Sequence, residues 1–560
     1  MTTVANHDII LDVSKKANLP FVVVKNIVDM LDKGNTVPFI SRYRKEKIQG
    51  LEPEKVHEIR SLVDKFKEIY LKVNTAIKKL GDKGVLSHEL QRELMDCKTT
   101  EDVEVIMEPY REVKKSLAQK ACEAKIDEIV DNMMNGKLII DLNQARRLTN
   151  NEDFNTPASL EEGILCILSD KISKNINVTK YSKLKLKLFP PNIRTNVKRD
   201  ANKVQDHKKY SKYFNYSSST TNLFPHMILA INRAESKNVV SVKLEFHNKY
   251  ISLLKDNIMQ TLFMNCHPRN RAVFERAADR SISKSLLPKM VRYTRSEMLS
   301  FAEQISLDTF KSNLRRLMMA APLTTSSIDA DAMQDLIMSD TNIPGDRLPV
   351  IGIDPGYVHG CKWAAVDAHG SLLAHGVFYP FKPDSHKPLF EVINIYQINI
   401  LAVGNGKGCR EVEEWIIKSK NENLFKLDAN LVYCFVSENG ASIYSASALA
   451  KEELPDIDVT IRGAVSIARR LQDPMAELVK IEPQHLGVGM YQHDLKKTQL
   501  SEALDAVVEE CISFVGVDAN TAPLHIFQKI AGLGPKKASA IIEYRKKMGG
   551  FKSRHDLKKL

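Results

Sequence analysis

Residues 349–369, PVIGIDPGYVHGCKWAAVDAH, decide the fold of the C-terminal half of this 560-residue chain. An apolar run at 350–353 ends in Asp354, a Pro-Gly pair turns the chain, and residues 361–366 return as a second apolar run. This pattern predicts a hairpin of two strands. A carboxylate at the end of a buried strand is costly to desolvate, so Asp354 is a candidate for metal or phosphate chemistry.

The sequence that follows the hairpin has the pattern of an α/β domain. Strands are expected at 350–354, 361–367, 371–379, 399–403 and 432–437, and helices between them include 409–418 and 441–453. A strand hairpin that leads into alternating strands and helices is the order of a ribonuclease-H-like mixed sheet. We place this domain at residues 349–460.

The rest of the chain has helical periodicity, so the fold class is multidomain and mainly α, with one α/β domain. We divide it into a helical N-terminal region at 1–220, a helical central region at 221–325, a helical linker at 463–515 and a C-terminal domain at 516–560. The polar, turn-rich stretch 323–348 marks the boundary before the α/β domain.

Composition narrows the class of partner and the compartment. The net charge of +12 favours a polyanion, most simply nucleic acid. No apolar run reaches the roughly 20 residues that span a bilayer, and the N-terminus lacks the pattern of a secretory signal. The eight cysteines form no CxxC pair, which argues against a zinc ribbon or a disulfide framework. We therefore expect an intracellular protein of the nucleus or cytoplasm, neither secreted nor bound to a membrane.

The C-terminal domain carries the most specific motif. Gly532, Leu533 and Gly534 form a tight turn, Pro535 begins a helix, and Lys536 and Lys537 follow. Free N–H groups and the positive end of the helix dipole suit a phosphate there. We interpret this motif as a helix-hairpin-helix that binds the nucleic-acid backbone. The alternative interpretation is a corner between two helices with a glycine cap. HLGVGMYQH, at 485–493, is a weaker copy.

Two basic segments are further candidates for nucleic-acid contact. Segment 181–212 interleaves aromatic residues with basic ones, and its candidate contacts are Lys183, Lys185, Lys187, Lys198, Arg199, Lys208 and Lys209. Its alternative interpretation is a solvated face. GNTVPFISRYRKE, at 34–46, is either a phosphate or base contact or a helix-start packing motif.

Acidic residues define a possible catalytic site. Two-metal phosphodiester hydrolysis needs several carboxylates together, and Asp354, Glu438 and Asp505 are the candidates for holding Mg²⁺ or Mn²⁺. The strand at 399–403 is followed by Asn405, which offers an amide where an acid would help. We therefore favour an inert polar remnant that holds no metal or other cofactor.

Several stretches resemble the Tex proteins of bacteria: GIDPG, AVGNGKGCRE, VSENGASIYSAS, TIRGAVSIARRLQDPMAELVKIEP and GLGPKKASAIIEYRKKMGGFKSRHDL. The resemblance implies a helical N-terminal region with a helix-turn-helix-like part, a YqgF-type ribonuclease-H-like domain, tandem helix-hairpin-helices and an S1 domain. It also implies a nucleic-acid binder linked to transcription or RNA handling, whose YqgF-type domain is not an active nuclease. Asp354 and Glu438 fall on the family's acidic positions, and Asp505 is a less certain match.

The resemblance further implies that the family continues beyond Leu560. We therefore expect a truncated form without the S1 domain and with an incomplete second hairpin, in which Phe551 and Leu557 are poorly covered. The leading hypothesis is a non-catalytic protein that binds RNA, DNA or both with low sequence specificity, together with proteins of transcription or RNA processing. The alternatives are a Mg²⁺- or Mn²⁺-dependent nuclease of ribonuclease-H type and a protein-interaction scaffold in transcription or chromatin.

Overall fold

The computed structural model describes residues 2–559 apart from gaps at 36, 98, 108–109, 111–116, 141–151, 324–346, 357, 383, 423, 425–430, 521 and 531. The chain divides into two compact units. Unit 1 comprises residues 1–29 and 47–305, and unit 2 comprises residues 30–46 and 306–560. Most of the predicted boundary stretch 323–348 lies outside the described residues.

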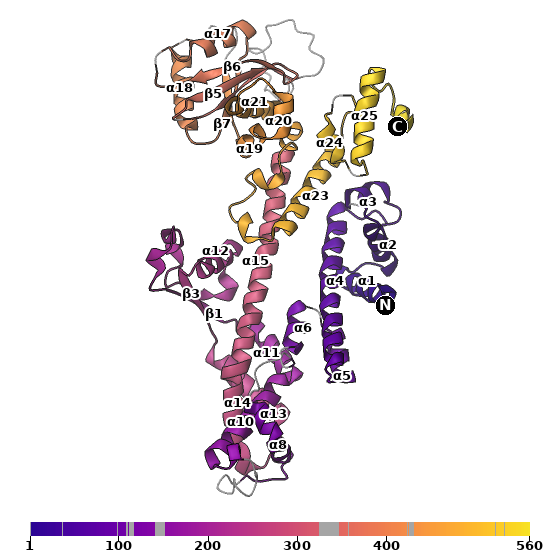
Figure 1. The fold of residues 1–560 in the computed structure, drawn as a ribbon, viewed down its shortest axis with the longest axis vertical. Helices are drawn as coiled ribbons and strands as arrows, with labels where there is room; N and C mark the ends of the chain where they lie inside the picture. Colours follow the sequence, from indigo (N-terminus) through magenta and orange to yellow (C-terminus); the bar gives the residue numbers. More distant parts are fainter. Residues whose placement is uncertain are drawn as a thin grey trace. The chain divides into compact units, whose positions relative to one another are not determined.

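Unit 1 is built mainly of helices (Figure 1). They are α1 (Thr2–Ala17), α2 (Phe21–Asp32), α4 (Pro53–Asp82), α5 (His88–Met95), α6 (Thr100–Met107), α7 (Leu117–Glu123), α8 (Ile126–Met134), α10 (Pro157–Lys174), α11 (Ile176–Leu188), α12 (Pro225–Ser236), α13 (Asn248–Leu262), α14 (Arg271–Ser281) and the first part of α15 (Leu287–Met318). Periodic apolar residues of α8, α10, α13 and α14 form one buried core, which confirms the helical prediction for this half. Among the described residues, no helix is both long enough and apolar enough to cross a bilayer.

A small antiparallel sheet completes unit 1. Its strands are β1 (Asn192–Val197), β2 (Ser217–Ser219) and β3 (Val240–Glu245), in the order β2-β1-β3. The alternating residues at 239–246 form one strand, β3, which pairs with β1 inside the basic segment 181–212. That segment is therefore divided among a helix, a strand and two 3₁₀ helices, Ala201–Lys203 and His207–Tyr213.

Unit 2 contains the predicted α/β domain. Its strands are β4 (Val350–Asp354), β5 (Cys361–Val366), β6 (Leu372–Phe378), β7 (Ile400–Gly404) and β8 (Val432–Val436), in the order β6-β5-β4-β7-β8. The first three pair antiparallel, and β4, β7 and β8 run parallel. The order and the strand positions confirm the ribonuclease-H-like mixed sheet.

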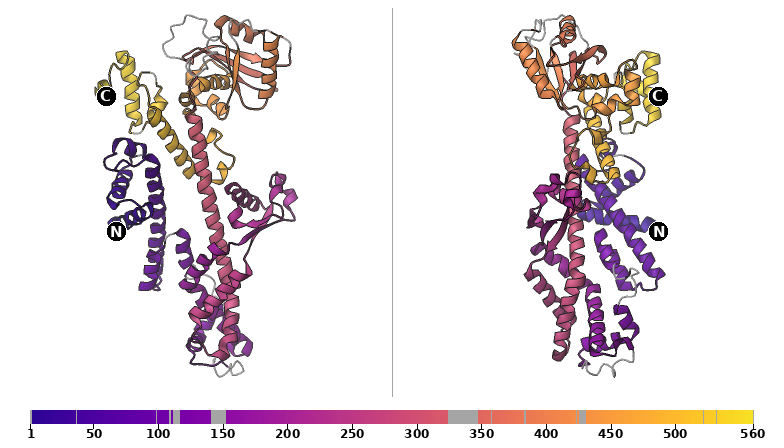
Figure 2. Two further views of the ribbon diagram at one scale, coloured as in Figure 1. Left: turned by 180° about the vertical axis from the view of Figure 1, so that it is seen from behind. Right: turned by 60° about the vertical axis from the view of Figure 1, so that its left-hand side comes forward.

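Helices cover both faces of this sheet (Figures 1 and 2). One face packs on α17 (Lys387–Tyr396) and α18 (Cys409–Asn421) through residues such as Ile393 and Trp415. The other packs on α21 (Val459–Gln472). A Cβ on Gly352 of β4 would lie 2.1 Å from the carbonyl oxygen of Ala464, so this close approach requires glycine. The domain therefore extends to about residue 472, and α21 is no linker.

The remaining helices of unit 2 are α3 (Val37–Tyr43), α19 (Ala441–Ser445), α20 (Ala448–Glu453), α22 (Pro474–Leu478), α23 (Lys497–Val515), α24 (Leu524–Gln528) and α25 (Pro535–Met548). The helix predicted at 441–453 is thus two short helices. Helices α23 to α25 share a core with the second part of α15. Phe551 stacks on Tyr544 at 4.7 Å and packs on this core, so the expectation that it is poorly covered was wrong. Leu557 is 42% exposed, as expected.

Candidate nucleic-acid interface and the acidic site

The predicted hairpin is formed by α24 and α25. Ile526 and Phe527 of α24 pack with Ala538 and Ile541 of α25, so apolar faces join the two helices. Gly532 has φ +83, a conformation that favours glycine, and the N–H of residue 533 donates to the carbonyl of residue 530 at 3.0 Å. The structure thus has the turn geometry expected from the sequence.

The start of α25 is open to solvent. Gly534 is the N-cap residue, no side chain caps the helix, and Pro535 occupies its first turn. Gly534, Lys536 and Lys537 are all exposed. First-turn N–H groups, the helix dipole and two ammonium groups therefore face the same solvent region, which is the chemistry of a phosphate-binding site.

Residues 485–493, which resemble a weaker copy of the motif, do not form a helix-hairpin-helix. Residues 485–493 form two short 3₁₀ turns joined by a loop rather than two packed α-helices. A Cβ on Gly489 would lie 1.9 Å from the ring of Phe310 in α15. This glycine allows the loop to pack closely on the helix, which explains its presence without a phosphate.

The seven basic candidates of segment 181–212 do not form one continuous strip. Lys183 pairs with Asp102 of α6, and its Nζ lies 4.4 Å from the ring centroid of Tyr293, so its charge is used inside unit 1. The others occupy different elements or pair locally: Lys185 lies over Tyr181 at 5.2 Å, Lys198 donates to Asn238 at 2.9 Å, Lys209 pairs with Asp206 at 2.9 Å, and Lys187, Arg199 and Lys208 are exposed.

The acidic site lies where β4, β7 and β8 end. Asp354 is the last residue of β4, and Glu438 follows β8. Asn405 follows β7, and its side-chain oxygen accepts a hydrogen bond from the Glu438 backbone N–H at 3.2 Å. The structure therefore brings Asp354 and Glu438 together, and Asn405 positions Glu438 rather than serving as a third acid.

Glycines form the walls of this site. A Cβ on Gly406 would lie 1.6 Å from Glu438 Oε1, and a Cβ on Gly463 of α21 would lie 2.9 Å from Asp354 Oδ2. The Gly406 backbone N–H donates to the Glu438 carboxylate. Helix α21 is thus packed directly against the carboxylates.

Arg470 of α21 supplies a buried positive charge. Its side chain is 3% exposed, and Nη1 donates to the backbone carbonyls of Ser437 at 2.6 Å and Asn439 at 2.9 Å, on either side of Glu438. Its Nε and Nη2 atoms and Glu438 Oε2 are buried without a hydrogen-bond partner among the described residues. An arginine guanidinium remains protonated in proteins, so a permanent cation lies beside the carboxylates.

Burial dominates the titration of these groups. Burial, and after it the Glu438 carboxylate, raise the pKa of Asp354 to about 6, although Lys362 and Arg470 act to lower it. Burial also raises the pKa of Glu438. Burial lowers the pKa of Arg470, whereas the nearby carboxylates of Glu477, Glu438 and Asp354 raise it. Raised carboxylate pKa values occur at active sites and in structural charge clusters alike.

Asp505 does not join these two carboxylates. It lies on α23, accepts from Ser501 at 3.2 Å and pairs with Lys529 at 2.9 Å. Within the described parts of the chain, no three His, Cys, Asp or Glu side chains are grouped to hold a metal. Two carboxylates beside a buried guanidinium do not fit a divalent-metal site, because the positive charge of the guanidinium repels a divalent cation bound by the carboxylates.

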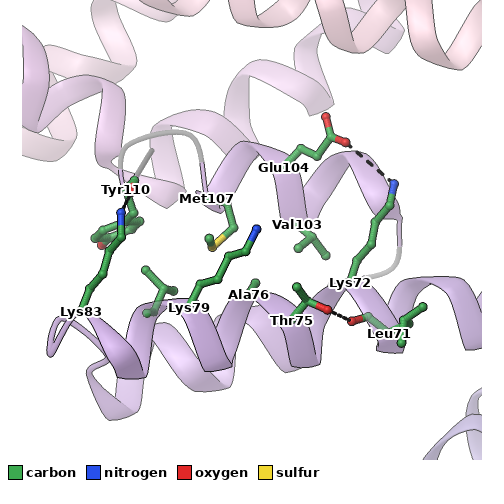
Figure 3. Close-up of a pocket in the computed structure, with 11 residues that line it drawn as sticks. Leu71, Lys72, Thr75, Ala76, Lys79, Lys83, Val103, Glu104, Met107 and Tyr110 are labelled. Atoms are coloured by element: carbon green, nitrogen blue, oxygen red, sulfur yellow. Dashed lines mark hydrogen bonds and ion pairs between the residues drawn. The ribbon is translucent and has the colours of Figure 1, made fainter. Parts of the chain in front are cut away.

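A concave surface in unit 1 contributes no residue to either site. It lies between α4 and α6, with Ala76, Val103 and Met107 facing one another across it (Figure 3). Lys72 pairs with Glu104 at 3.8 Å, and Lys83 donates to the carbonyl of Tyr110 at 3.1 Å. The ion pair holds α6 against α4, and the hydrogen bond links Tyr110 to the C-terminal end of α4.

Reasoning from the sequence missed Arg470. Its only signal was an Arg-Arg pair inside an otherwise apolar helical stretch, IARRL, where one arginine must point toward the core. The adjacent arginine, Arg469, pairs with Glu453 at 2.8 Å and donates to the carbonyl of Gly370 at 2.8 Å. Both arginines thus fasten α21 to the sheet domain.

Four family profiles match along the chain. They are the Tex-like protein N-terminal domain at residues 7–81, the Tex central region-like profile at 142–310, the Tex protein YqgF-like domain at 348–472 and the helix-hairpin-helix motif at 512–560. The YqgF-like match includes α21, in agreement with its packing on the sheet.

Relatives match over nearly the whole chain. The human S1 RNA-binding domain-containing protein 1 is 33% identical over 571 residues, which cover 99% of this chain and 54% of that protein. This chain therefore spans about half the length of that relative. The transcriptional accessory protein Tex of Neisseria gonorrhoeae is 32% identical over 98% of this chain and 69% of its own length. The uncharacterized protein YdcI of Bacillus subtilis is 30% identical over 98% and 73%. Together with the Tex-specific profiles, these matches establish that the chain belongs to the Tex family.

Proposed function

We propose that this chain is a non-catalytic nucleic-acid-binding protein of the Tex type, which acts inside the cell, in nucleus or cytoplasm, in transcription or RNA metabolism. The observation that carries the proposal is the helix-hairpin-helix at α24 and α25, with its open helix start and exposed Lys536 and Lys537. The names of two relatives, a transcriptional accessory protein and an S1 RNA-binding domain-containing protein, support the process.

The mode of binding follows from the chemistry of the hairpin. Backbone N–H groups and lysines contact phosphate oxygens, which are the same for every base. Binding is therefore weakly sequence-specific and weakens as salt rises, because phosphate neutralisation releases counterions. The hairpin alone does not distinguish RNA from DNA.

The proposal that the acidic site is not catalytic rests on Arg470. Its guanidinium is buried beside Asp354 and Glu438, where a nuclease would bind divalent ions. The third candidate acid, Asp505, is engaged by Lys529 instead. The site then serves to attach α21 to the ends of the strands.

The binding proposal is tested by reversing the charge at the hairpin. The double variant Lys536→Glu/Lys537→Glu should weaken binding of a labelled single strand and of a labelled duplex by at least tenfold at low salt, and should flatten the salt dependence of both. Fluorescence anisotropy measures both quantities. The matched control is Lys546→Glu/Lys547→Glu, which makes the same charge change at the exposed far end of α25 and should have a smaller effect. Equal effects of the two double variants would remove the hairpin from the proposal.

The catalytic question has a separate test. Purified protein incubated with Mn²⁺ should leave labelled linear and branched nucleic acids intact. Cleavage that disappears in Asp354→Asn, with unchanged nucleic-acid binding, would instead establish a nuclease of ribonuclease-H type. A gel-based cleavage assay with a known nuclease as positive control separates the two outcomes.

A further inference from the structure

The aromatic and basic segment 34–46 lies beside the hairpin within unit 2, although about 490 residues separate them in the sequence. Helix α3 packs against α23, and its apolar residues Val37 and Ile40 are buried. Its exposed Tyr43 remains outside this contact. The two interpretations of the segment as packing motif and as contact surface therefore apply to different faces of the same helix.

Phe39 connects this segment to the phosphate-binding turn. Its ring carbons lie 3.4 and 3.5 Å from the position that a Cβ on Gly532 would occupy. The same ring is 5.3 Å from the Tyr43 ring, centroid to centroid, and 5.1 Å from the guanidinium carbon of Arg44. One aromatic ring thus lies near the turn, a second aromatic ring and a cation.

The groups arranged around Phe39 are accessible to a ligand. Tyr43 is 53% exposed, and Arg44 and Lys45 are exposed. Arg44 Nη1 also donates to the Tyr43 carbonyl at 2.8 Å, which holds the guanidinium near the rings. Single-stranded nucleic acid presents unstacked bases and phosphates. An exposed tyrosine ring can stack on a base, and the adjacent cations and phosphate-binding turn can bind the phosphates.

We propose that α3 and the α24–α25 hairpin form one composite site for single-stranded nucleic acid. Phosphates contact the start of α25 with Lys536 and Lys537, and an unpaired base stacks on Tyr43 with Arg44 and Lys45 contacting the adjoining backbone. A duplex, whose bases are already stacked on one another, gains only the phosphate contacts. This inference rests on the proposed function of the hairpin and adds to it a preference for single strands.

The test compares three labelled probes of one sequence: single-stranded RNA, single-stranded DNA and the DNA duplex. Tyr43→Ser should weaken binding of the single strands by about tenfold, because one stacked base is lost, and should change duplex binding by less than about twofold. The matched control is Tyr396→Ser, since Tyr396 is 43% exposed on α17, a helix of the sheet domain. Circular dichroism of each variant verifies that the fold is retained.

The outcomes separate the inference from the proposal on which it rests. If Tyr43→Ser changes no probe, or weakens all three equally, the composite site is overturned while binding by the hairpin stands. If the wild-type chain binds none of the probes, the proposed function itself fails. A larger loss with RNA than with DNA would identify RNA as the ligand of the composite site, and the reverse would identify DNA.

Discussion

At the scale of single residues, Asp354 and Arg470 determine whether the acidic site at the ends of β4, β7 and β8 is catalytic or structural. A carboxylate at this position invites a catalytic interpretation, and its pKa of about 6 is compatible with one. The guanidinium beside it favours a different interpretation, in which acid and base form a charge cluster that holds α21 in place. Burial and the Glu438 carboxylate raise the pKa of Asp354 more than Lys362 and Arg470 lower it, so the guanidinium compensates the buried carboxylate only in part.

The pKa of Asp354 leads to a prediction about stability. An acid whose pKa rises from 3.8 to about 6 on folding destabilises the folded state as pH increases through that interval, because the folded chain holds the proton longer. The shift corresponds to roughly 3 kcal/mol as an upper bound. Asp354→Asn should therefore raise the free energy of unfolding by about 1–3 kcal/mol at pH 7.5, and by less at pH 5.

Denaturant unfolding of wild type and variant at both pH values measures this difference. Asp367→Asn is a suitable control, since the Asp367 side chain accepts hydrogen bonds from the N–H groups of His369 and Ser371 in an exposed turn. A variant that is less stable than wild type at pH 7.5, or a difference that does not change with pH, would contradict the burial of a charge at Asp354.

At the scale of elements, the contact between β4 and α21 controls the acidic site. The strand can approach the helix only because residue 352 has no side chain, and this approach brings Gly463 and Arg470 to the carboxylates. In the hairpin of α24 and α25, Gly532 has a different role: its φ of +83 favours glycine, whereas a Cβ there would lie 3.4 Å from the Phe39 ring, an ordinary contact distance. Small residues therefore set the geometry of both sites.

Gly352→Ala tests this contact. The added methyl group overlaps the carbonyl of Ala464, so α21 must shift, and we expect a loss of about 1–3 kcal/mol of stability. Hydrogen exchange of residues 459–472 should be faster than in wild type. Gly81→Ala in α4 is the control, because no atom lies within 4 Å of its Cβ position, and alanine there should be neutral or stabilising by less than about 1 kcal/mol. Unchanged exchange in α21 would show that the contact tolerates a side chain.

At the scale of the whole molecule, the net charge is +12, and the basic residues predicted to bind nucleic acid lie in both units. The basic segment of unit 1 is divided among several elements, and Lys183 and Lys209 are committed to ion pairs. In unit 2, by contrast, Arg44 lies over the Phe39 ring, and the same ring lies near Gly532 of the hairpin that carries the exposed Lys536 and Lys537. Sequence distance is therefore a poor guide to where the binding charge is gathered.

The sequence by itself determined the strands of the α/β domain, the hairpin and the helical character of most of the remaining chain, but not β1 inside the basic segment 181–212. Apolar runs of strand length, the Pro-Gly turn after Asp354 and the glycine turn before Pro535 are local signals, so the five strands and the hairpin were predicted within one or two residues. Only the tertiary structure decided which side chains meet. Folding brings Arg470 to Glu438 and the Phe39 ring near Gly532, and it pairs Asp505 with Lys529 instead of bringing it to Asp354. Local propensity carries no information about such contacts, because packing and desolvation act on residues that are neighbours only after folding.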